Sequence, residues 1–144
     1  MATDLSDGEL AQALKARLRP LLPWWFGFDV TLEREQAEVS YRVFRFGFRS
    51  SWGRRGWGRP TDPTDPDFLS LTDEVAEILI AIQEDVWGAK HRTWPVRNAK
   101  LGPSCPFDSL PKPHAEVRGH TLHVSFPAVG VTLPPIELSR NGGD

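Results

Sequence analysis

One stretch of the sequence combines the residue types that bind nucleic acid or dock a protein partner. Residues 42–60 read RVFRFGFRSSWGRRGWGRP and contain six arginines and five large aromatic residues, with no acidic residue among them. Single-stranded nucleic acid is held by basic grooves with aromatic faces on which bases stack. Trp and Arg are also the residue types enriched at the hot spots of protein interfaces. The stretch therefore indicates a surface for one of these two classes of partner.

The acidic residues that follow offer a third interpretation of the same arginines. Residues 62–85 carry eight acidic side chains and no Lys or Arg. Asp62, Asp65 and Asp67 can fold back and neutralise the arginines within the protein itself. The same three carboxylates are ligand types for a hard cation, but the run lacks the glycine and the distal glutamate of an EF-hand loop.

Strand alternation narrows the choice of contact residues within the basic stretch. Successive side chains of a strand point to opposite faces, and this predicts that the phenylalanines at 44, 46 and 48 belong to the core. The residues left to contact a partner lie further along the chain. They are Trp52, Arg54, Arg55, Trp57 and Arg59.

The histidines are of the right type for zinc but stand at an unsuitable spacing. The available ligands are His114, His120 and His123, with Cys105 and either His91 or Asp108. His120 and His123 are three residues apart on a predicted strand and so point to opposite faces. The chain has no CxxC, no HExxH and no helical HxxH. We therefore expect no metal site.

The only cysteine, Cys105, lies between prolines in GPSCPF, with the nearest following histidine, His114, nine residues later. A cysteine nucleophile needs an adjacent base, and nothing in the spacing brings one to it. Phosphate loops and dinucleotide fingerprints are also absent. We predict no catalytic site and no cofactor; in an enzyme, Cys105, Asp108 and His114 would be the candidate residues.

A series of short motifs runs through the second half of the chain. They are VWG at 86–88, WP at 94–95, CP at 105–106, the histidine at 114, EVRG at 116–119 and IEL at 136–138. In these motifs, residues 86–138 resemble the C-terminal half of small uncharacterised actinobacterial proteins, which carry a second CP after the hairpin. Phe126 stands where that second cysteine would be, so the resemblance gives no support to a metal site. It implies an actinobacterial or actinophage origin and no particular activity.

Composition limits the class of protein. A chain of 144 residues is long enough to form one domain with its own core, and a formal net charge of −2 does not favour nucleic acid. A single cysteine excludes an intrachain disulfide framework. The acidic start MATDLSDGEL is not a signal peptide, and no apolar run is long enough to span a bilayer. We expect a cytoplasmic protein that does not contact a membrane.

The periodicity predicts an α+β domain with two main helices and an antiparallel sheet. The capping box SDGE begins a helix at Ser6 that ends at Pro20, and TDEVAEILIAIQEDVWG predicts a second helix with Thr72 as N-cap and Gly88 at its end. Between the two helices, alternation over 26–49 predicts a hairpin whose phase slip indicates a β-bulge or a strand buried on both faces near its end. Residues 50–67 show no period and predict a long flexible loop.

After the second helix, 115–126 predicts a hairpin, 131–138 predicts edge strands, and 139–144 predicts a frayed tail. The predicted order is α-β-β-long loop-α-β-β-edge strand. On this basis we expect a non-enzymatic protein-binding or assembly module that docks a protein partner through the 50–67 loop. Phage or mobile-element structural proteins, chaperones and immunity-type proteins all belong to this class. The alternative is single-stranded nucleic-acid binding by residues 42–60.

Overall fold

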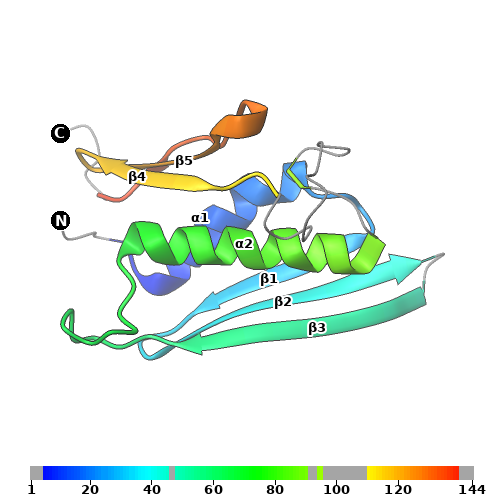
Figure 1. Cartoon of the computed structure of the whole chain (residues 1–144), viewed down its shortest axis with the longest axis horizontal. Coiled ribbons are helices and arrows are strands. Elements are labelled where there is room, and N and C mark those ends of the chain that lie inside the picture. The colour runs from blue at the N-terminus through cyan, green and yellow to red at the C-terminus, as the bar shows by residue number, and fades with distance from the viewer. Residues whose placement is uncertain (1–4, 46–47, 91–93, 96–109, 140–144) are drawn as a thin grey trace.

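Two antiparallel sheets enclose a pair of helices, so that the chain forms three layers (Figure 1). The computed structural model describes residues 5–45, 48–90, 94–95 and 110–139, with only the backbone described at 45, 48–51 and 89–90. The helices are α1 (Asp7–Leu18) and α2 (Leu71–Lys90), and short 3₁₀ turns follow α1 and β5: η1 (Arg19–Leu21) and η2 (Pro127–Val129). This arrangement confirms the predicted α+β class, although the strands form two sheets where one was expected.

The first sheet has the strand order β1-β2-β3 and lies on one side of the helices. Its strands are β1 (Phe26–Leu32), β2 (Gln36–Arg45) and β3 (Phe48–Gly58), each antiparallel to its neighbour. In the second sheet, β5 (Thr121–Phe126) pairs with the other three strands: β4 (His114–Arg118), β6 (Val131–Thr132) and β7 (Ile136–Glu137). The predicted hairpin and edge strands at this end of the chain are thus confirmed, with Gly119 in the left-handed region at φ 63° in the hairpin turn.

Helix α1 begins at the predicted capping box. The Ser6 hydroxyl accepts a hydrogen bond from the Glu9 amide at 3.1 Å, and the Glu9 carboxylate accepts one from the Ser6 amide at 3.3 Å. Leu10, Leu14 and Leu18 form the buried stripe that the helical spacing predicts. The helix ends in the 3₁₀ turn that contains a proline, because proline has no amide hydrogen with which to continue it.

Helix α2 lies between the two sheets and contacts β2 on one side and β4 on the other. Its N-cap is Ser70, whose hydroxyl accepts from the Asp73 amide at 3.3 Å, so the prediction of Thr72 was two residues late. The helix also continues two residues past Gly88. Gln83 is buried within it, and its side-chain amide donates to the backbone carbonyls of Trp94 and Pro111.

The predicted β-bulge is present where β2 pairs with β3, and the register shifts between Val43 and Phe44. Phe44 directly follows the inward-facing Val43 in β2 and so lies on the outer face of the sheet, where its ring lies over Gly27; a Cβ at Gly27 would stand 3.2 Å from that ring. The prediction that Phe44 belongs to the core is therefore wrong, because β2 keeps its alternation through Phe44 and the extra residue of the bulge, Ser50, lies in β3. Phe46 and the side chain of Phe48 lie outside the described residues.

The main correction concerns residues 50–58, which form most of β3 and not a loop. Their inward-facing positions are occupied by Gly53, Arg55 and Trp57 in place of the aliphatic residues that mark a buried strand. Gly53 allows the ring of Tyr41 to lie across β3, since a Cβ there would stand 2.6 Å from Tyr41 Cε1. Only residues 59–70 connect β3 to α2.

Candidate protein-docking edge at strand β3

Among the described residues, β3 is an edge strand of the first sheet, and no strand pairs with its outer side. The Arg59 amide donates to the Glu35 carbonyl at 2.9 Å, which fixes the phase of the β2–β3 ladder so that 53, 55 and 57 bond towards β2. The alternate residues point their backbone N–H and C=O groups away from the sheet. They are Trp52, Arg54, Gly56 and Gly58. All four residues are exposed, and their backbone groups have no hydrogen-bond partner in the described part of the chain.

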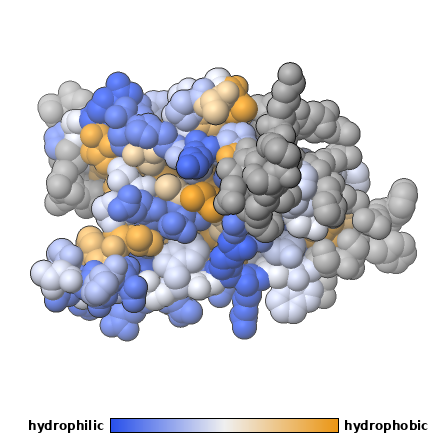
Figure 2. Space-filling view, in the orientation of Figure 1, coloured by the Kyte–Doolittle hydropathy of each residue, from blue (hydrophilic) through white to orange (hydrophobic). Residues whose placement is uncertain are grey.

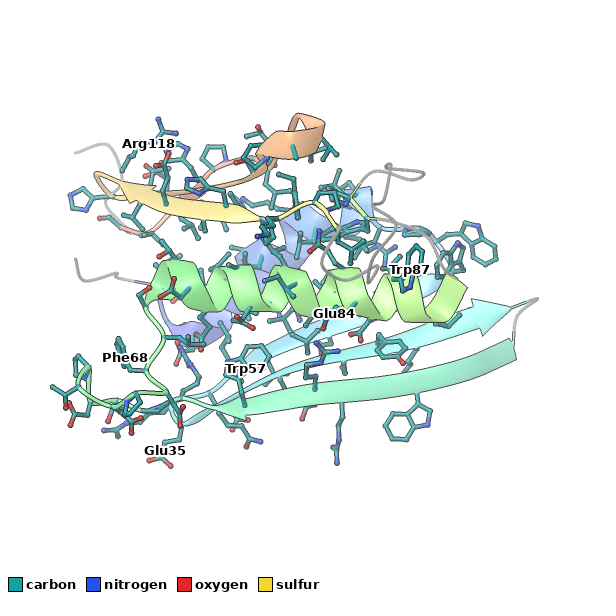
Figure 3. All side chains as sticks on the ribbon, in the orientation of Figure 1. Glu35, Trp57, Phe68, Glu84, Trp87 and Arg118 are labelled. Atoms are coloured by element: carbon teal, nitrogen blue, oxygen red, sulfur yellow. The ribbon has the colours of Figure 1, made fainter. Side chains whose placement is uncertain are left out.

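On the inner face, Arg55 is neutralised by helix α2. Its guanidinium forms an ion pair with Glu84 and lies 3.6 Å from Asp85. Figure 3 shows Glu84 on the side of α2 that faces β3. Burial raises the pKa of Asp85 to about 6, even though the charge of Arg55 acts to lower it. The second carboxylate oxygen of Asp85 is buried, and within the described residues it has no partner.

Arg59 links the end of β3 to both helices. It forms ion pairs with Asp7 at 3.1 Å and with Glu74 at 2.9 Å, and it donates to the backbone carbonyl of Glu33. Burial alone would lower the pKa of Arg59, but the hydrogen bond that Arg59 donates to Asp7 and the charge of Glu74 outweigh it, so the pKa is raised. The Trp57 indole N–H also donates to Glu74, at 3.4 Å.

The acids that neutralise these arginines are therefore not the ones that the sequence suggested. Asp62, Asp65 and Asp67 form no ion pair with an arginine among the described residues. Asp62 instead accepts from the amide and the hydroxyl of Thr64, and these bonds lower the pKa of its carboxyl. Asp65 accepts from the Asp67 amide at 2.8 Å. The carboxylates of Asp62 and Asp65 therefore shape the turn after β3.

The five predicted contact residues thus divide between two faces of the sheet. Arg55, Trp57 and Arg59 face the helices and contribute to the fold. Trp52 and Arg54 lie on the outer face, where the Trp52 side chain is 61% exposed. Arg54 has no ion pair within the described part of the chain. Only these two residues offer side chains that are free for a partner.

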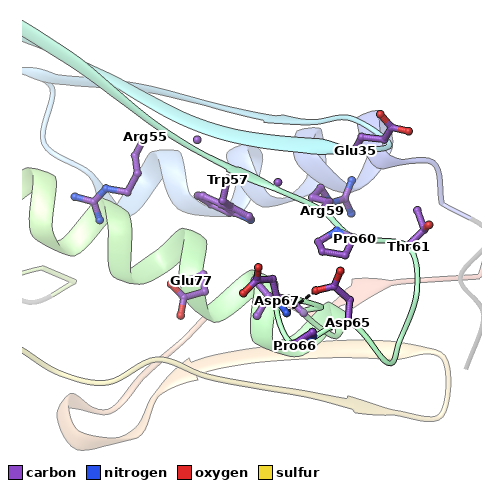
Figure 4. A pocket seen from close by; sticks show the side chains of 13 residues that line it. Glu35, Arg55, Trp57, Arg59, Pro60, Thr61, Asp65, Pro66, Asp67 and Glu77 are labelled. Carbon is purple, nitrogen blue, oxygen red and sulfur yellow. Dashed lines mark hydrogen bonds between the residues drawn. The ribbon is translucent and has the colours of Figure 1, made fainter.

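A cleft of about 910 Å³ runs beside the open edge, between β3, the 60–67 turn and α2 (Figure 4). Residues 55–59 form one wall, and Glu77 of α2 stands opposite. A second hollow of about 610 Å³ is lined by outer-face residues, including Glu38 and Arg54. Both hollows are lined by residues 56–58, so the end of β3 is open on its two sides. The sequence pattern gave no sign of this, because Glu77 reads as an ordinary exposed helical residue.

The remaining candidate residues do not come together in a site. His114 lies 3.8 Å from Glu116, and His123 is the cross-strand neighbour of the same glutamate. Across the described residues, no three His, Cys, Asp or Glu side chains gather as ligands for a metal ion. His91, Cys105 and Asp108 lie outside the described residues.

Comparison of the chain with protein families, with curated proteins and with solved structures finds no match. Neither α1 nor α2, the helices of the described part, has the length and hydrophobicity that a membrane crossing requires. Figure 2 shows hydrophobic residues in several separate patches on one face of the molecule, with hydrophilic residues between them. The open edge of β3 is therefore the feature that offers the most specific basis for a functional proposal.

Proposed function

We propose that the protein is a non-enzymatic binding or assembly module that accepts an extended segment of a partner protein as a fourth strand beside β3. The carrying observation is the set of exposed backbone N–H and C=O groups at Trp52, Arg54, Gly56 and Gly58. A strand that adds to a sheet edge gains affinity from such main-chain hydrogen bonds, and its alternate side chains provide specificity.

The length and composition of β3 support this proposal. Folded proteins usually shield a long edge strand with charged side chains, a proline, a covering loop or a bulge, because unpaired strand edges aggregate. Of these protections β3 has the charges of Arg54 and Arg55, and that of Arg55 is neutralised by Glu84. Strand β3 has eleven residues and no proline, and its bulge lies near the end opposite Gly58. The exposed Trp52 ring beside the edge adds an aromatic contact of the kind enriched at interfaces.

The nucleic-acid alternative gains less from the same surface. Arg55 and Arg59 are engaged in ion pairs with Glu84, Glu74 and Asp7. A groove that tracks a phosphate backbone needs cations that are free to replace its counterions. Acidic residues also line the cleft beside β3, and they would repel phosphate. We therefore prefer a protein partner.

A matched pair of variants tests the proposal. Arg54→Pro removes one amide donor of the open edge, at a position where an edge strand tolerates proline. Arg54→Ala keeps that donor and removes only the side chain. Peptides selected on the wild type from a displayed dodecapeptide library should bind Arg54→Pro at least about tenfold more weakly by fluorescence anisotropy, and Arg54→Ala much more nearly like the wild type.

Binding should also slow hydrogen exchange at the amides of residues 54, 56 and 58, because these would become cross-strand donors. Circular dichroism and thermal melting of both variants report whether the fold is intact. The proposal fails if the selected peptides bind a folded Arg54→Pro variant as tightly as the wild type, or if the library yields no binder.

A further inference from the structure

We infer that the segment docked beside β3 carries lysine or arginine on the side that faces helix α2, where the acidic cleft receives these side chains. This inference rests on the proposed strand addition and names the chemistry of the partner. It follows from where the cleft lies relative to the open edge, and from which of the cleft's charges are already compensated within the protein.

The geometry determines which side chains of the partner enter the cleft. A strand added to β3 would lie about 4.8 Å from it, and its side chains would alternate between the two faces of the sheet. Those on the inner face point in the same direction as Arg55 and Trp57, towards α2. That direction leads into the 910 Å³ cleft, whose far side is formed by Glu77 and the 65–67 turn. Long side chains fit there.

The cleft has an excess of negative charge once the internal ion pairs are counted. Arg55 and Arg59 line it, but each is matched by two carboxylates from the helices. Four further carboxylates line the same cleft and form no ion pair within the described part of the chain. They are Glu35, Asp65, Asp67 and Glu77. A cleft lined by uncompensated charges of one sign concentrates ligands of the opposite sign.

Two further observations favour a basic segment of another protein over a second copy of β3. The Trp57 ring also lines the cleft, and a cation over an indole face gains additional attraction. A second β3 would bring three arginines and no acid, and its own Arg55 already binds Glu84. Self-pairing would leave the Arg54 side chains near one another or near glycine. The first is unfavourable because like charges on paired strands repel, and the second offers no side chain to pair with.

Three synthetic peptides of twelve residues test the inference: Thr-Lys repeated six times, and the same sequence with Gln or Glu in place of Lys. In each, all variable side chains lie on one face of a strand and can point into the cleft. At low salt the Lys peptide should bind the full chain at least about tenfold more tightly than the Gln peptide, and the Glu peptide should bind most weakly. The difference should shrink as salt is added.

Two double variants that remove equal negative charge distinguish binding of the Lys peptide in the cleft from its general electrostatic attraction to the protein. Asp67→Asn/Glu77→Gln should abolish most of the Lys preference. Glu116→Gln/Glu137→Gln, in the second sheet, removes the same charge from residues that do not line the cleft and should retain the preference. Binding that survives in the Arg54→Pro variant would show that the Lys peptide attaches without adding a strand, which overturns the inference.

The two proposals fail in distinguishable ways. If peptides bind in a manner that Arg54→Pro abolishes but the Gln or Glu peptide binds as well as the Lys peptide, strand addition stands and the basic partner is wrong. If library and synthetic peptides alike show no binding that Arg54→Pro weakens, both proposals fall. A dimer in sedimentation that Arg54→Pro dissolves and the Lys peptide does not displace would identify a second copy as the occupant and refute the basic segment.

Discussion

Replacement of Arg59 by alanine should destabilise the protein more than a surface substitution can. The guanidinium contacts Asp7 of α1, Glu74 of α2 and the carbonyl of Glu33, so it joins three elements that are distant in sequence. The Arg59 side chain is only 19% exposed and that of Glu74 only 7%. Truncation would leave Glu74 as a buried charge whose remaining described partner is the Trp57 indole at 3.4 Å.

The expected loss of stability follows from the loss of the counterion of Glu74. Removal of one partner of a buried ion pair costs about 3–5 kcal/mol, because the other charge stays buried without a counterion. Arg59 is partly exposed and Asp7 is more so, which lets water reach the site. We therefore expect a loss of about 2–4 kcal/mol in the free energy of unfolding. With a urea slope of about 2 kcal/mol per molar, the midpoint falls by about 1–2 M.

Urea unfolding followed by circular dichroism measures the effect, and a second substitution identifies its cause. Arg59→Ala/Glu74→Gln removes the stranded charge while keeping its shape, so this double variant should be more stable than Arg59→Ala alone. Arg59→Lys, which keeps the charge but not the fork of donors, should fall between them and the wild type. A loss below about 0.5 kcal/mol, or a double variant less stable than the single one, would contradict the reasoning.

Three further substitutions test other parts of the structure by the same unfolding assay. Burial raises the pKa of Asp85 to about 6, so the folded chain binds a proton more tightly than the unfolded chain and stability falls as pH rises from about 4 to 6. Between these limits the free energy of unfolding of the wild type should fall by about 1–2 kcal/mol relative to that of Asp85→Asn. A difference that stays flat or rises with pH would contradict this. Gly53→Ala should cost about 1–3 kcal/mol, since its Cβ would meet the Tyr41 ring at 2.6 Å. Its control is Gly58→Ala, which meets no atom within 4 Å, and equal losses in the two variants would refute the explanation. Ser6→Ala removes the helix cap and should cost about 1 kcal/mol; no change would show that the cap is unimportant.

Local signals in the sequence predicted the elements whose formation depends on local interactions. The Ser6 capping box, the apolar stripe of α2 and the phase slip before Phe44 each correspond to a feature of the structure. Strand β3 escaped prediction because its inward positions hold glycine, arginine and tryptophan, and no aliphatic alternation marks it. Gly53 reads as a loop residue although it is required by the Tyr41 ring packed against it.

The sequence indicated which stretch of the chain contains the candidate edge, but not the face on which each residue lies or the acids with which the arginines pair. The basic stretch does contain the open edge, yet the face on which each residue lies depends on strand register, which only the folded chain fixes. Charge matching depends even more on tertiary structure, since the nearest acids in sequence are not those that pair with Arg55 and Arg59. Helices α1 and α2 supply those acids from positions that are up to 52 residues away.

The alternation of β3 also separates two sets of mutations. Residues 53, 55 and 57 face the helices or the neighbouring strand, whereas positions 52, 54 and 58 lie on the open face, where Gly58 leaves room for a side chain. Under the proposed strand addition, substitutions at these three positions would change which segment is recognised while the core stays as it is. A directed-evolution library confined to these positions could therefore retarget the protein, and natural divergence along the strand should be fastest at the same three residues.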